Sequence, residues 1–260
     1  MSRFIISGGG TGGHIFPAIA IADALRKAQP DCEILFVGAQ GRMEMEKVPA
    51  AGYKIMGLPV AGLQRSLSLS NLALPFKVMQ SVRMAKNIIR EFRPDAVVGV
   101  GGYASAPVLW SATSRNIPSL IQEQNSYAGL TNKILGKRVS RICVAYDKME
   151  QFFPADKIIF TGNPVREGIA PATADQKAEG IKFYNLDPQK KTIFIVGGSL
   201  GARTMNATMK KWIVEKAESA DYQIIWQSGK FYKNEIDEFL KDKNLPNVRN
   251  LTFISRMDLA

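Results

Sequence analysis

Residues 7–14 read Ser-Gly-Gly-Gly-Thr-Gly-Gly-His and follow the apolar run Phe4-Ile5-Ile6. An amphipathic run begins directly after them, at Ile15, and continues to Ala28. The order is therefore a strand, a glycine-rich turn and a helix. Glycines adopt positive φ and allow a ligand to approach the backbone closely, and the unpaired amides at a helix start favour an anion. We interpret this stretch as a binding site for a phosphate-bearing ligand.

The glycines alone leave the identity of that ligand open. From position 8 to position 13 they also match the fingerprint G-x-G-x-x-G of dinucleotide-binding turns. An NAD site requires an acidic residue at the end of the second strand, where it binds the ribose hydroxyls. Here residues 34–37 run into Gly38-Ala39-Gln40, and Asp31 and Glu33 precede the strand. An NAD(P)-dependent oxidoreductase is therefore disfavoured, and a turn that needs glycine for packing alone is the other alternative.

Length and charge limit the class of protein. The chain has 260 residues, which is enough for two domains with separate cores. Its 34 Lys and Arg against 23 Asp and Glu give a net charge of +11, which suits nucleic acid, anionic lipid or a phosphorylated substrate. No arginine-rich tract or aromatic-basic RNA motif occurs, so nucleic acid is the weaker option. No signal-peptide pattern is present, and we expect a cytoplasmic protein with peripheral membrane contact only.

The first part of the chain alternates apolar strands with helical patterns. We expect six strands, at residues 3–7, 33–37, 96–100, 119–122, 141–144 and 158–160. Near-continuous apolar runs separated by helices indicate a parallel sheet that is covered on both faces. The pattern predicts a doubly wound α/β domain, with ligands at the carboxyl ends of its strands.

A second α/β domain is expected from residue 163. Pro164 holds the preceding residue in an extended conformation, so we place the domains at 1–162 and 163–260. Strands are expected at residues 192–196, 223–227 and 248–254. Three strands are fewer than such a sheet normally has, so we expect an incomplete second domain and a chain that is part of a longer one. Glycine turns at 99–102 and 197–201 also follow strong strands, which suggests loops that face each other across a cleft.

Several longer motifs occur in a fixed order along almost the whole chain. They are Gly-Gly-Thr-Gly-Gly-His (9–14), Gly-Gly-Tyr-Ala-Ser (101–105), Glu-Gln-Asn (123–125), Gly-Leu-Thr-Asn-Lys (129–133), Gly-Asn-Pro-Val-Arg (162–166), Gly-Gly-Ser-x-Gly-Ala-Arg (197–203) and Gln-Ser-Gly-Lys (227–230). In residue identity and in order they resemble the MurG family of bacterial glycosyltransferases.

This resemblance implies a GT-B fold, in which two Rossmann-like domains face each other across a cleft. It implies a hexosyltransferase that moves N-acetylglucosamine from UDP-GlcNAc to the muramyl sugar of undecaprenyl-linked lipid I, which gives lipid II in peptidoglycan synthesis. The first domain would bind the acceptor and the membrane, and the second would bind UDP-GlcNAc. The expected location is the cytoplasmic face of the bacterial membrane, with no cofactor and with other cell-wall synthesis proteins as further partners.

Members of that family continue beyond the point at which this sequence stops. Their further βα units include an Ala-Leu-Thr-x-x-Glu helix start and a downstream glutamine, and both contact the sugar nucleotide. A non-catalytic module that binds acceptor and membrane is therefore an alternative to a complete transferase.

Inverting glycosyl transfer needs a base for the acceptor hydroxyl and stabilisation of the departing UDP. No Asp-x-Asp metal motif occurs, so helix N-termini and basic side chains would have to carry the leaving-group charge. His14 is the only histidine and, with a pKa near neutrality, is the leading candidate for the base. Glu123 is the rival base or an orienting group, or it pairs with a neighbouring Arg. Tyr103 contacts acceptor phosphate or sugar, or simply packs.

For the donor, the resemblance implies that UDP-GlcNAc contacts Thr11, Gly12, Gly13, Asn125, Arg166, Ser199 and Ile254. Ser199 and its turn can donate to phosphate, Arg166 can neutralise it, and Asn125 can bind the sugar. Ile254 would act through its backbone groups on uracil, and its side chain is expected to be a core residue.

Residues 61–93 contain six basic residues and one acid, Glu91. Apolar residues at the spacing of Leu72, Phe76 and Met79 normally face a core, but other apolar residues here lie beside basic side chains. That combination suits a helix at the surface of an anionic membrane. The expected membrane contacts are Leu72, Leu74, Phe76, Lys77, Met79 and Arg83.

Overall fold

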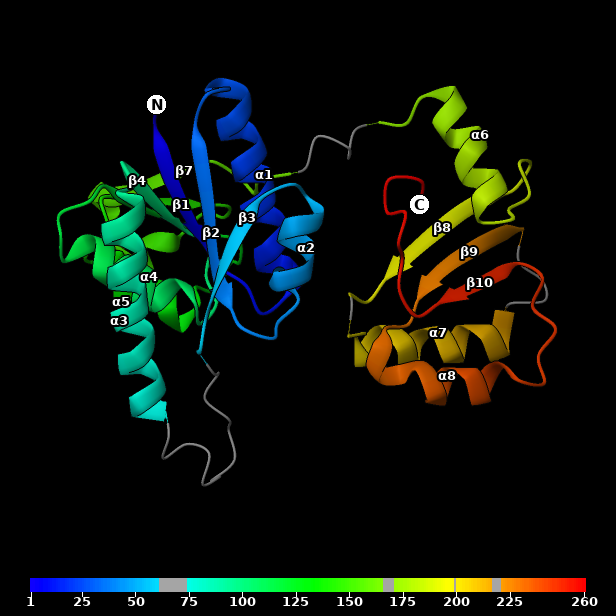
Figure 1. The fold of residues 1–260 in the computed structure, drawn as a ribbon. Helices are drawn as coiled ribbons and strands as arrows, with labels where there is room; N and C mark the ends of the chain where they lie inside the picture. The colour runs from blue at the N-terminus through cyan, green and yellow to red at the C-terminus, as the bar shows by residue number, and fades with distance from the viewer. Residues whose placement is uncertain (61–73, 166–170, 199, 217–220) are drawn as a thin grey trace. The chain divides into compact units, whose positions relative to one another are not determined.

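The structure is a computed structural model that describes residues 1–60, 74–165, 171–198, 200–216 and 221–260. The chain divides into two compact units, Met1–Glu167 and Gly168–Ala260 (Figure 1). The boundary predicted from the sequence, after residue 162, lies a few residues before this division.

The first unit contains a parallel sheet of seven strands in the order β3-β2-β1-β4-β5-β6-β7. The strands are β1 (Arg3–Ser7), β2 (Glu33–Ala39), β3 (Lys54–Leu58), β4 (Ala96–Gly99), β5 (Ser119–Glu123), β6 (Arg141–Val144) and β7 (Ile158–Phe160). All six predicted strands are present within a residue or two of their expected ends. β3 was not predicted, because this edge strand is half-exposed and Lys54 and Gly57 interrupt its apolar pattern.

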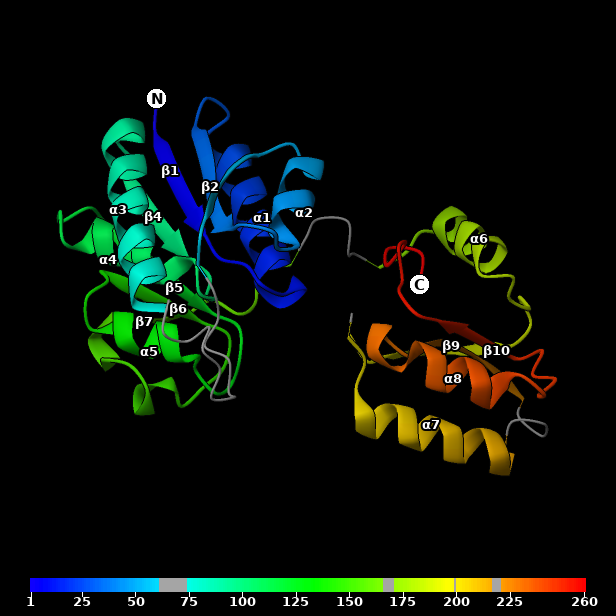
Figure 2. The ribbon, with the colours of Figure 1, turned by 60° about the horizontal axis from the view of Figure 1, so that its bottom comes forward.

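Helices cover both faces of this sheet, as Figures 1 and 2 show. They are α1 (Gly12–Ala28), α2 (Glu44–Ala50), α3 (Leu74–Phe92), α4 (Ser105–Thr113) and α5 (Leu130–Gly136), followed by the short 3₁₀ turns η2 (Met149–Gln151) and η3 (Ala155–Lys157). Alternate strand residues enter opposite cores: Ile6 packs with α1 and α2, whereas Ile5 packs with α3, α4 and α5. This is the doubly wound arrangement that the sequence predicts, and it gathers the loops after the strands at one edge.

The second unit has three parallel strands in the order β10-β9-β8. Its elements are α6 (Ala174–Phe183), β8 (Lys191–Val196), α7 (Arg203–Lys216), β9 (Tyr222–Gln227), η5 (Lys230–Tyr232), α8 (Lys233–Leu240) and β10 (Val248–Leu251). One core joins Trp226 and Ile224 to α7 and α8. A smaller core on the other face contains Tyr184, Ile225 and Ile254. The last predicted strand is shorter than expected, since the ladder ends at residue 251.

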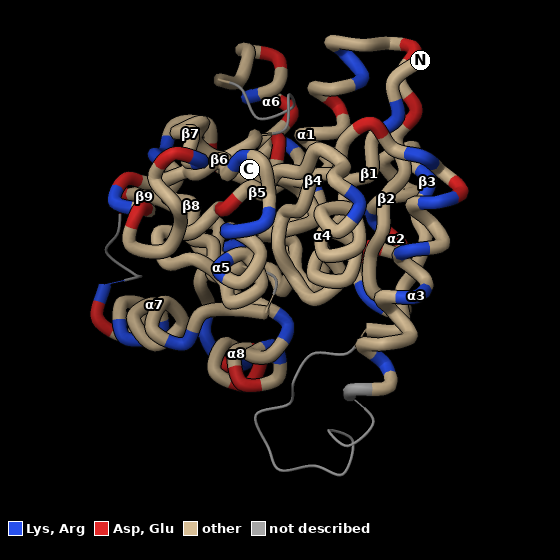
Figure 3. Tube along the Cα trace, turned by 90° about the vertical axis from the view of Figure 1, so that its left-hand side faces the viewer, with Lys and Arg blue, Asp and Glu red and all other residues tan. Residues whose placement is uncertain are grey.

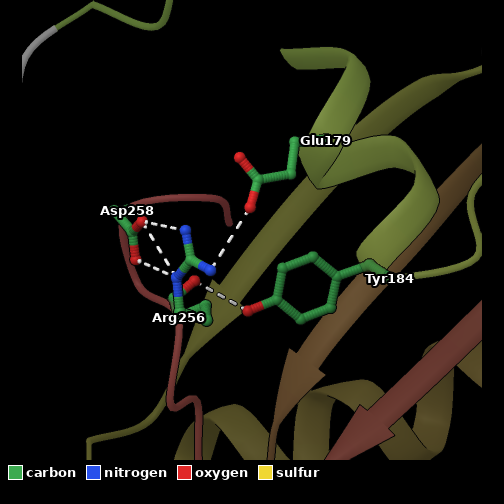
Figure 4. Close-up of polar contacts among 4 residues, drawn as sticks. All are labelled: Glu179, Tyr184, Arg256 and Asp258. Carbon is green, nitrogen blue, oxygen red and sulfur yellow. Dashed lines mark hydrogen bonds and ion pairs between the residues drawn. The ribbon is translucent and has the colours of Figure 1, made fainter. Parts of the chain in front are cut away.

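The segment after β10 is held against α6 by polar contacts (Figure 4). Arg256 pairs with Asp258 at 2.7 Å and with Glu179 at 3.3 Å, and the Tyr184 hydroxyl donates to the Arg256 carbonyl at 2.8 Å. The hydrogen bonds from Arg256 lower the pKa of Asp258. These charged groups are exposed, so they order the segment more than they stabilise the fold.

Among the described helices, none is both long enough and apolar enough to cross a lipid bilayer.

Candidate active site

The two glycine turns of the first unit pack against each other backbone to backbone. They follow β1 and β4, which are neighbours in the sheet. A Cβ at Gly102, where φ is +81°, would lie 2.5 Å from the Gly9 carbonyl oxygen. A Cβ at Gly8 would lie 2.1 Å from a methyl carbon of Val100. Both turns therefore need glycine for close approach.

A cavity of about 860 Å³ lies over the carboxyl edge of the sheet in the first unit. Both glycine turns line it, together with the end of β5, α3, α4 and α5. Of the residues predicted for the site, it brings together Thr11, His14, Tyr103, Glu123 and Asn125. Gly12 and Gly13, in the first turn of α1, are not among the residues that line it. The apolar part of the lining includes Val78, Pro107, Trp110, Leu130 and Ile134.

The His14 ring is fixed at one nitrogen and accessible at the other. Nδ1 lies 3.1 Å from the Gly9 carbonyl oxygen and 3.3 Å from Thr11 Oγ1. With Nδ1–H donating to that carbonyl, the assigned tautomer leaves a lone pair on Nε2. Nε2 lies beside Gly101, where a Cβ would come within 2.9 Å of it. The absence of a side chain at Gly101 therefore leaves room around Nε2.

The environment of His14 keeps it neutral near pH 7. Burial lowers the pKa of His14 from its ordinary value of 6.5. The hydrogen bond with Gly9 and the negative charges of Glu123 and Glu44 act in the opposite direction and are smaller. A neutral imidazole with one accessible nitrogen can accept a proton.

Glu123 is a buried carboxylate surrounded by donors, and only 1% of it is exposed. One oxygen accepts from the backbone and side-chain nitrogens of Asn125, at 3.1 and 3.0 Å. The other accepts from the Gly129 amide and from Asn132 Nδ2, both at 2.9 Å. Because four donors occupy the two oxygens, the loop after β5 is folded around Glu123. This arrangement suits an orienting group better than a base.

Asn132 was quoted within a motif but was not singled out from the sequence. Its side chain is 2% exposed and lines the cavity. Glu123 fixes the amide nitrogen, so the orientation of Oδ1 is determined. Among the described residues Oδ1 has no hydrogen-bond partner. A buried acceptor without a partner is costly.

Glu44 was also missed, because nothing in the local pattern distinguishes it from the exposed Glu46 two residues later. It is 1% exposed and lines the same cavity. Its carboxylate accepts from the amides of Gly10 and Ala39, both at 2.9 Å. An acid thus reaches the end of β2 from α2, although none follows that strand in sequence. It is bound to backbone amides, unlike the ribose-binding acid of an NAD site.

Several other predicted residues lie outside the described part of the chain or away from this cavity. Arg166, Ser199 and Leu72 are outside the described residues, as is the side chain of Leu74. Ile254 is 4% exposed and packs in the core of the second unit, as expected for its side chain. The predicted membrane residues Phe76, Lys77, Met79 and Arg83 are exposed on α3.

The second unit repeats the packing of paired turns. A Cβ at Gly201, where φ is +92°, would lie 2.3 Å from the Ser228 carbonyl oxygen, so the turns after β8 and β9 touch. Asn206 on α7 donates to the same carbonyl at 2.8 Å and accepts from Trp226 Nε1 at 3.1 Å. The buried Asn206 therefore holds the turn after β9 against α7.

Two Rossmann-like units in one chain, each with glycine turns packed at the carboxyl edge of a parallel sheet, are the parts of a GT-B fold, the fold that the comparisons also give. Comparison with known families agrees with the fold. Residues 4–144 match the glycosyltransferase family 28 N-terminal domain, and residues 192–260 match the glycosyltransferase family 28 C-terminal domain. The chain belongs to glycosyltransferase family 28.

Two relatives match almost the whole chain. A protein of Parabacteroides distasonis is 56% identical over 258 residues, which are 99% of this chain and 70% of the relative. One from Cytophaga hutchinsonii is 54% identical over 99% of this chain and 68% of the relative. Both are named UDP-N-acetylglucosamine--N-acetylmuramyl-(pentapeptide) pyrophosphoryl-undecaprenol N-acetylglucosamine transferase.

Solved structures show the same architecture. The crystal structure of Acinetobacter baumannii MurG matches with a TM-score of 0.67 and 26% identity, over 99% of this chain and 70% of that one. The UDP-GlcNAc 2-epimerase of Neisseria meningitidis matches with the same TM-score, 15% identity, and coverage of 99% and 73%. The second likeness concerns the fold alone.

Proposed function

We propose that this chain is an inverting glycosyltransferase that moves N-acetylglucosamine from UDP-GlcNAc to the muramyl sugar of lipid I, with lipid II and UDP as products. The observation that carries the proposal is the fixed His14 imidazole at the wall of the cavity. The names of the relatives supply the donor and the acceptor.

In this proposal Nε2 of His14 removes the proton of the acceptor hydroxyl. The acceptor oxygen forms a bond to the anomeric carbon of N-acetylglucosamine while the bond from that carbon to UDP breaks. UDP leaves with the electron pair, and the anomeric configuration inverts. The hydrogen bond from Nδ1 to the Gly9 carbonyl places the proton of the neutral ring on Nδ1. Burial, which lowers the pKa of His14, keeps the ring neutral before the reaction.

Glu123 is assigned an orienting role, because its oxygens already accept from four donors. It holds Asn125, which the resemblance assigns to the donor sugar, and it holds Asn132. Tyr103 is 56% exposed at the cavity and suits contact with acceptor phosphate or sugar.

The departing UDP is assigned to the second unit. Its glycine turn, which contains Ser199, precedes α7, and amides at a helix start favour an anion. Arg166 would neutralise the phosphates, and the backbone of Ile254 would bind uracil. Leaving-group charge would then be carried without a metal ion.

The proposal also places α3 at the surface of an anionic membrane. Phe76 is 73% exposed and Met79 is 65% exposed. Lys77 and Arg83 are exposed on the same helix, and basic positions recur along it (Figure 3). Val78 lines the cavity, so the helix connects this surface to the acceptor site. The protein would then bind its lipid-linked acceptor at the membrane surface.

A transfer assay with labelled UDP-GlcNAc and a short-chain lipid I analogue tests the proposal. We expect turnover by the wild type and a loss of about 10²–10⁴-fold in kcat for His14→Ala. Titration calorimetry with UDP-GlcNAc, and with NAD as a control, tests the donor, whose binding should be lost in Arg166→Ala. Vesicle binding without turnover or donor binding would favour the non-catalytic acceptor module, and NAD binding would favour an oxidoreductase.

A further inference from the structure

The Gly9–Gly10 peptide group connects a buried carboxylate to His14. On one side, the Gly10 N–H donates to Glu44 Oε2 at 2.9 Å. On the other side, the Gly9 carbonyl of the same peptide group lies 3.1 Å from His14 Nδ1. Carboxylate, peptide and imidazole therefore form a chain of two hydrogen bonds, in which each bond polarises the next.

The glycine turn is shaped around this carboxylate. A Cβ at Gly9 would lie 2.1 Å from Glu44 Oε1, and one at Gly38 would lie 2.6 Å from Glu44 Cγ. Neither position accepts a side chain while Glu44 is in place. The second carboxylate oxygen accepts from the Ala39 amide at the end of β2, so Glu44 joins the loops after β1 and β2.

The charge of Glu44 is balanced by backbone rather than by a cation. Within the described ranges no Lys or Arg forms an ion pair with it. The two backbone amides that donate hydrogen bonds to Glu44 and the N-terminus of α1 favour a negative charge at this place. Because Glu44 occupies the Gly10 amide, that donor is not open to a ligand phosphate. The anion at this part of the turn belongs to the protein itself.

We propose that Glu44 is a positioning residue for His14, and that it acts through the Gly9–Gly10 peptide group. The carboxylate fixes and polarises this peptide group, so that its carbonyl holds Nδ1–H and stabilises the imidazolium that forms when Nε2 accepts the acceptor proton. The role resembles that of the carboxylate in a catalytic triad, with a peptide group inserted between carboxylate and imidazole. The catalytic part of this inference rests on the proposed function, whereas the hydrogen-bond chain does not.

A nuclear magnetic resonance titration of the imidazole tests the chain without turnover, because His14 is the only histidine. The charged and titratable groups that line the cavity around it are Arg42, Glu44, Tyr103 and Glu123. In Glu44→Gln, we expect the pKa of His14 to fall, because the negative charge of Glu44 raises it in the wild type. In the wild type, the chemical shift of the Gly10 amide nitrogen should change over the pH range in which His14 is protonated. In Glu44→Gln this change should be lost.

The matched control is Glu46→Gln on the same helix, where the side chain is exposed and pairs with the adjacent Lys47. It should leave both signals unchanged. Glu44→Asp keeps the charge but is one methylene shorter, so faster exchange of the Gly10 amide is expected with a smaller shift of the His14 titration. If Glu44→Gln does not fold, Glu44→Asp can replace it in the titration.

In the transfer assay Glu44→Gln should lower kcat about tenfold near pH 7, with KM for UDP-GlcNAc unchanged. An unaltered His14 titration and an unaltered Gly10 signal in a folded Glu44→Gln would overturn the hydrogen-bond chain. An altered titration with unchanged kcat would overturn only the catalytic role. If the wild type shows no turnover, the proposed function fails, while the titration still decides whether the chain exists.

Discussion

Glu123 accepts hydrogen bonds from four donors, so at the scale of single residues its replacement should affect both shape and stability. In Glu123→Gln, an NH₂ group replaces one of the two oxygens that now accept hydrogen bonds, so the donors to that oxygen lose their acceptor. We expect about 1–3 kcal/mol less stability for each donor left unsatisfied, and a loss of transfer activity. Thermal unfolding and the transfer assay measure the two effects. Glu150→Gln, at an exposed position, is the control, and equal melting temperatures for both variants would contradict the prediction.

The lowered pKa of His14 gives a pH dependence with a definite sign. Since burial lowers its pKa in the folded state, the unfolded chain binds the proton first as the pH falls below 6.5. The free energy of unfolding should therefore decrease with falling pH until the folded pKa is passed. His14→Gln should remove this part of the slope. Urea unfolding of both proteins between pH 5.5 and 7.5 measures it, and a wild type that is relatively more stable at the lower pH would show the sign to be wrong.

The same lowered pKa applies to catalysis. A base must be unprotonated to act. The apparent pKa on the acidic side of the pH profile of kcat/KM should therefore lie below the ordinary histidine value of 6.5. Activity should persist as the pH is lowered toward 6. An apparent pKa above 6.5 would assign this titration to a different group, because kcat/KM reports the free enzyme.

Prediction from sequence selected residues that stand in recognisable motifs and missed those defined by long-range contacts. His14 and Glu123 could be selected because they sit in motifs at strand ends. Glu44 could not, because its two amide partners are five and 34 residues away. Asn132 depends on its contact with Glu123, which forms only when the loop after β5 closes.

At the scale of elements, the packing of the two glycine turns gives a matched pair of substitutions. Gly102 and Gly52 have nearly the same φ, +81° and +82°, but only Gly102 has backbone within reach of a Cβ. Gly52→Ala should cost about 1–2 kcal/mol from conformation alone. Gly102→Ala should cost more than about 3 kcal/mol, because the turns must separate. Denaturant unfolding measures both free energies. Similar losses of stability in the two variants would show that the two turns can separate at no energetic cost.

The exposed apolar residues of α3 predict a dependence of membrane binding on this helix. Replacing Phe76 and Met79 together by Ser should weaken binding to anionic vesicles by about tenfold or more, because buried apolar side chains contribute roughly 1.5–3 kcal/mol each. Val214→Ser is the control, since Val214 is 70% exposed on α7. Vesicle co-sedimentation measures the binding. If the double variant bound vesicles with the affinity of the wild type, these residues of α3 would not be part of the membrane contact.

The elements themselves followed from periodicity wherever both faces of a strand are buried. Such strands are continuous apolar runs, as in β1 and β6, and their ends were predicted correctly. β3 lies at the edge with alternate residues exposed, so its pattern was too weak to identify. The stripe that contains Phe76 and Met79 has the spacing of a core face, yet these residues are exposed. Periodicity shows that a helix has an apolar side and does not show what covers that side.

At the scale of the whole molecule, each hydrophobic core is built from residues of one unit only. A core substitution should therefore destabilise its own unit and leave the other almost unchanged, as distant sites usually do. Ile121→Ala in β5 and Ile224→Ala in β9 should each cost about 2–5 kcal/mol in their own unit.

Hydrogen exchange at increasing urea, read by mass spectrometry for each segment, can separate the two units, and each variant is the control for the other. Ile121→Ala should accelerate exchange in β4, β5 and β6, and Ile224→Ala should accelerate exchange in β8, β9 and β10. If either variant destabilised both units equally, the chain would unfold as one cooperative body. Effects of cavity variants such as Glu123→Gln on the second unit would then have to be interpreted as global unfolding rather than as changes at the site.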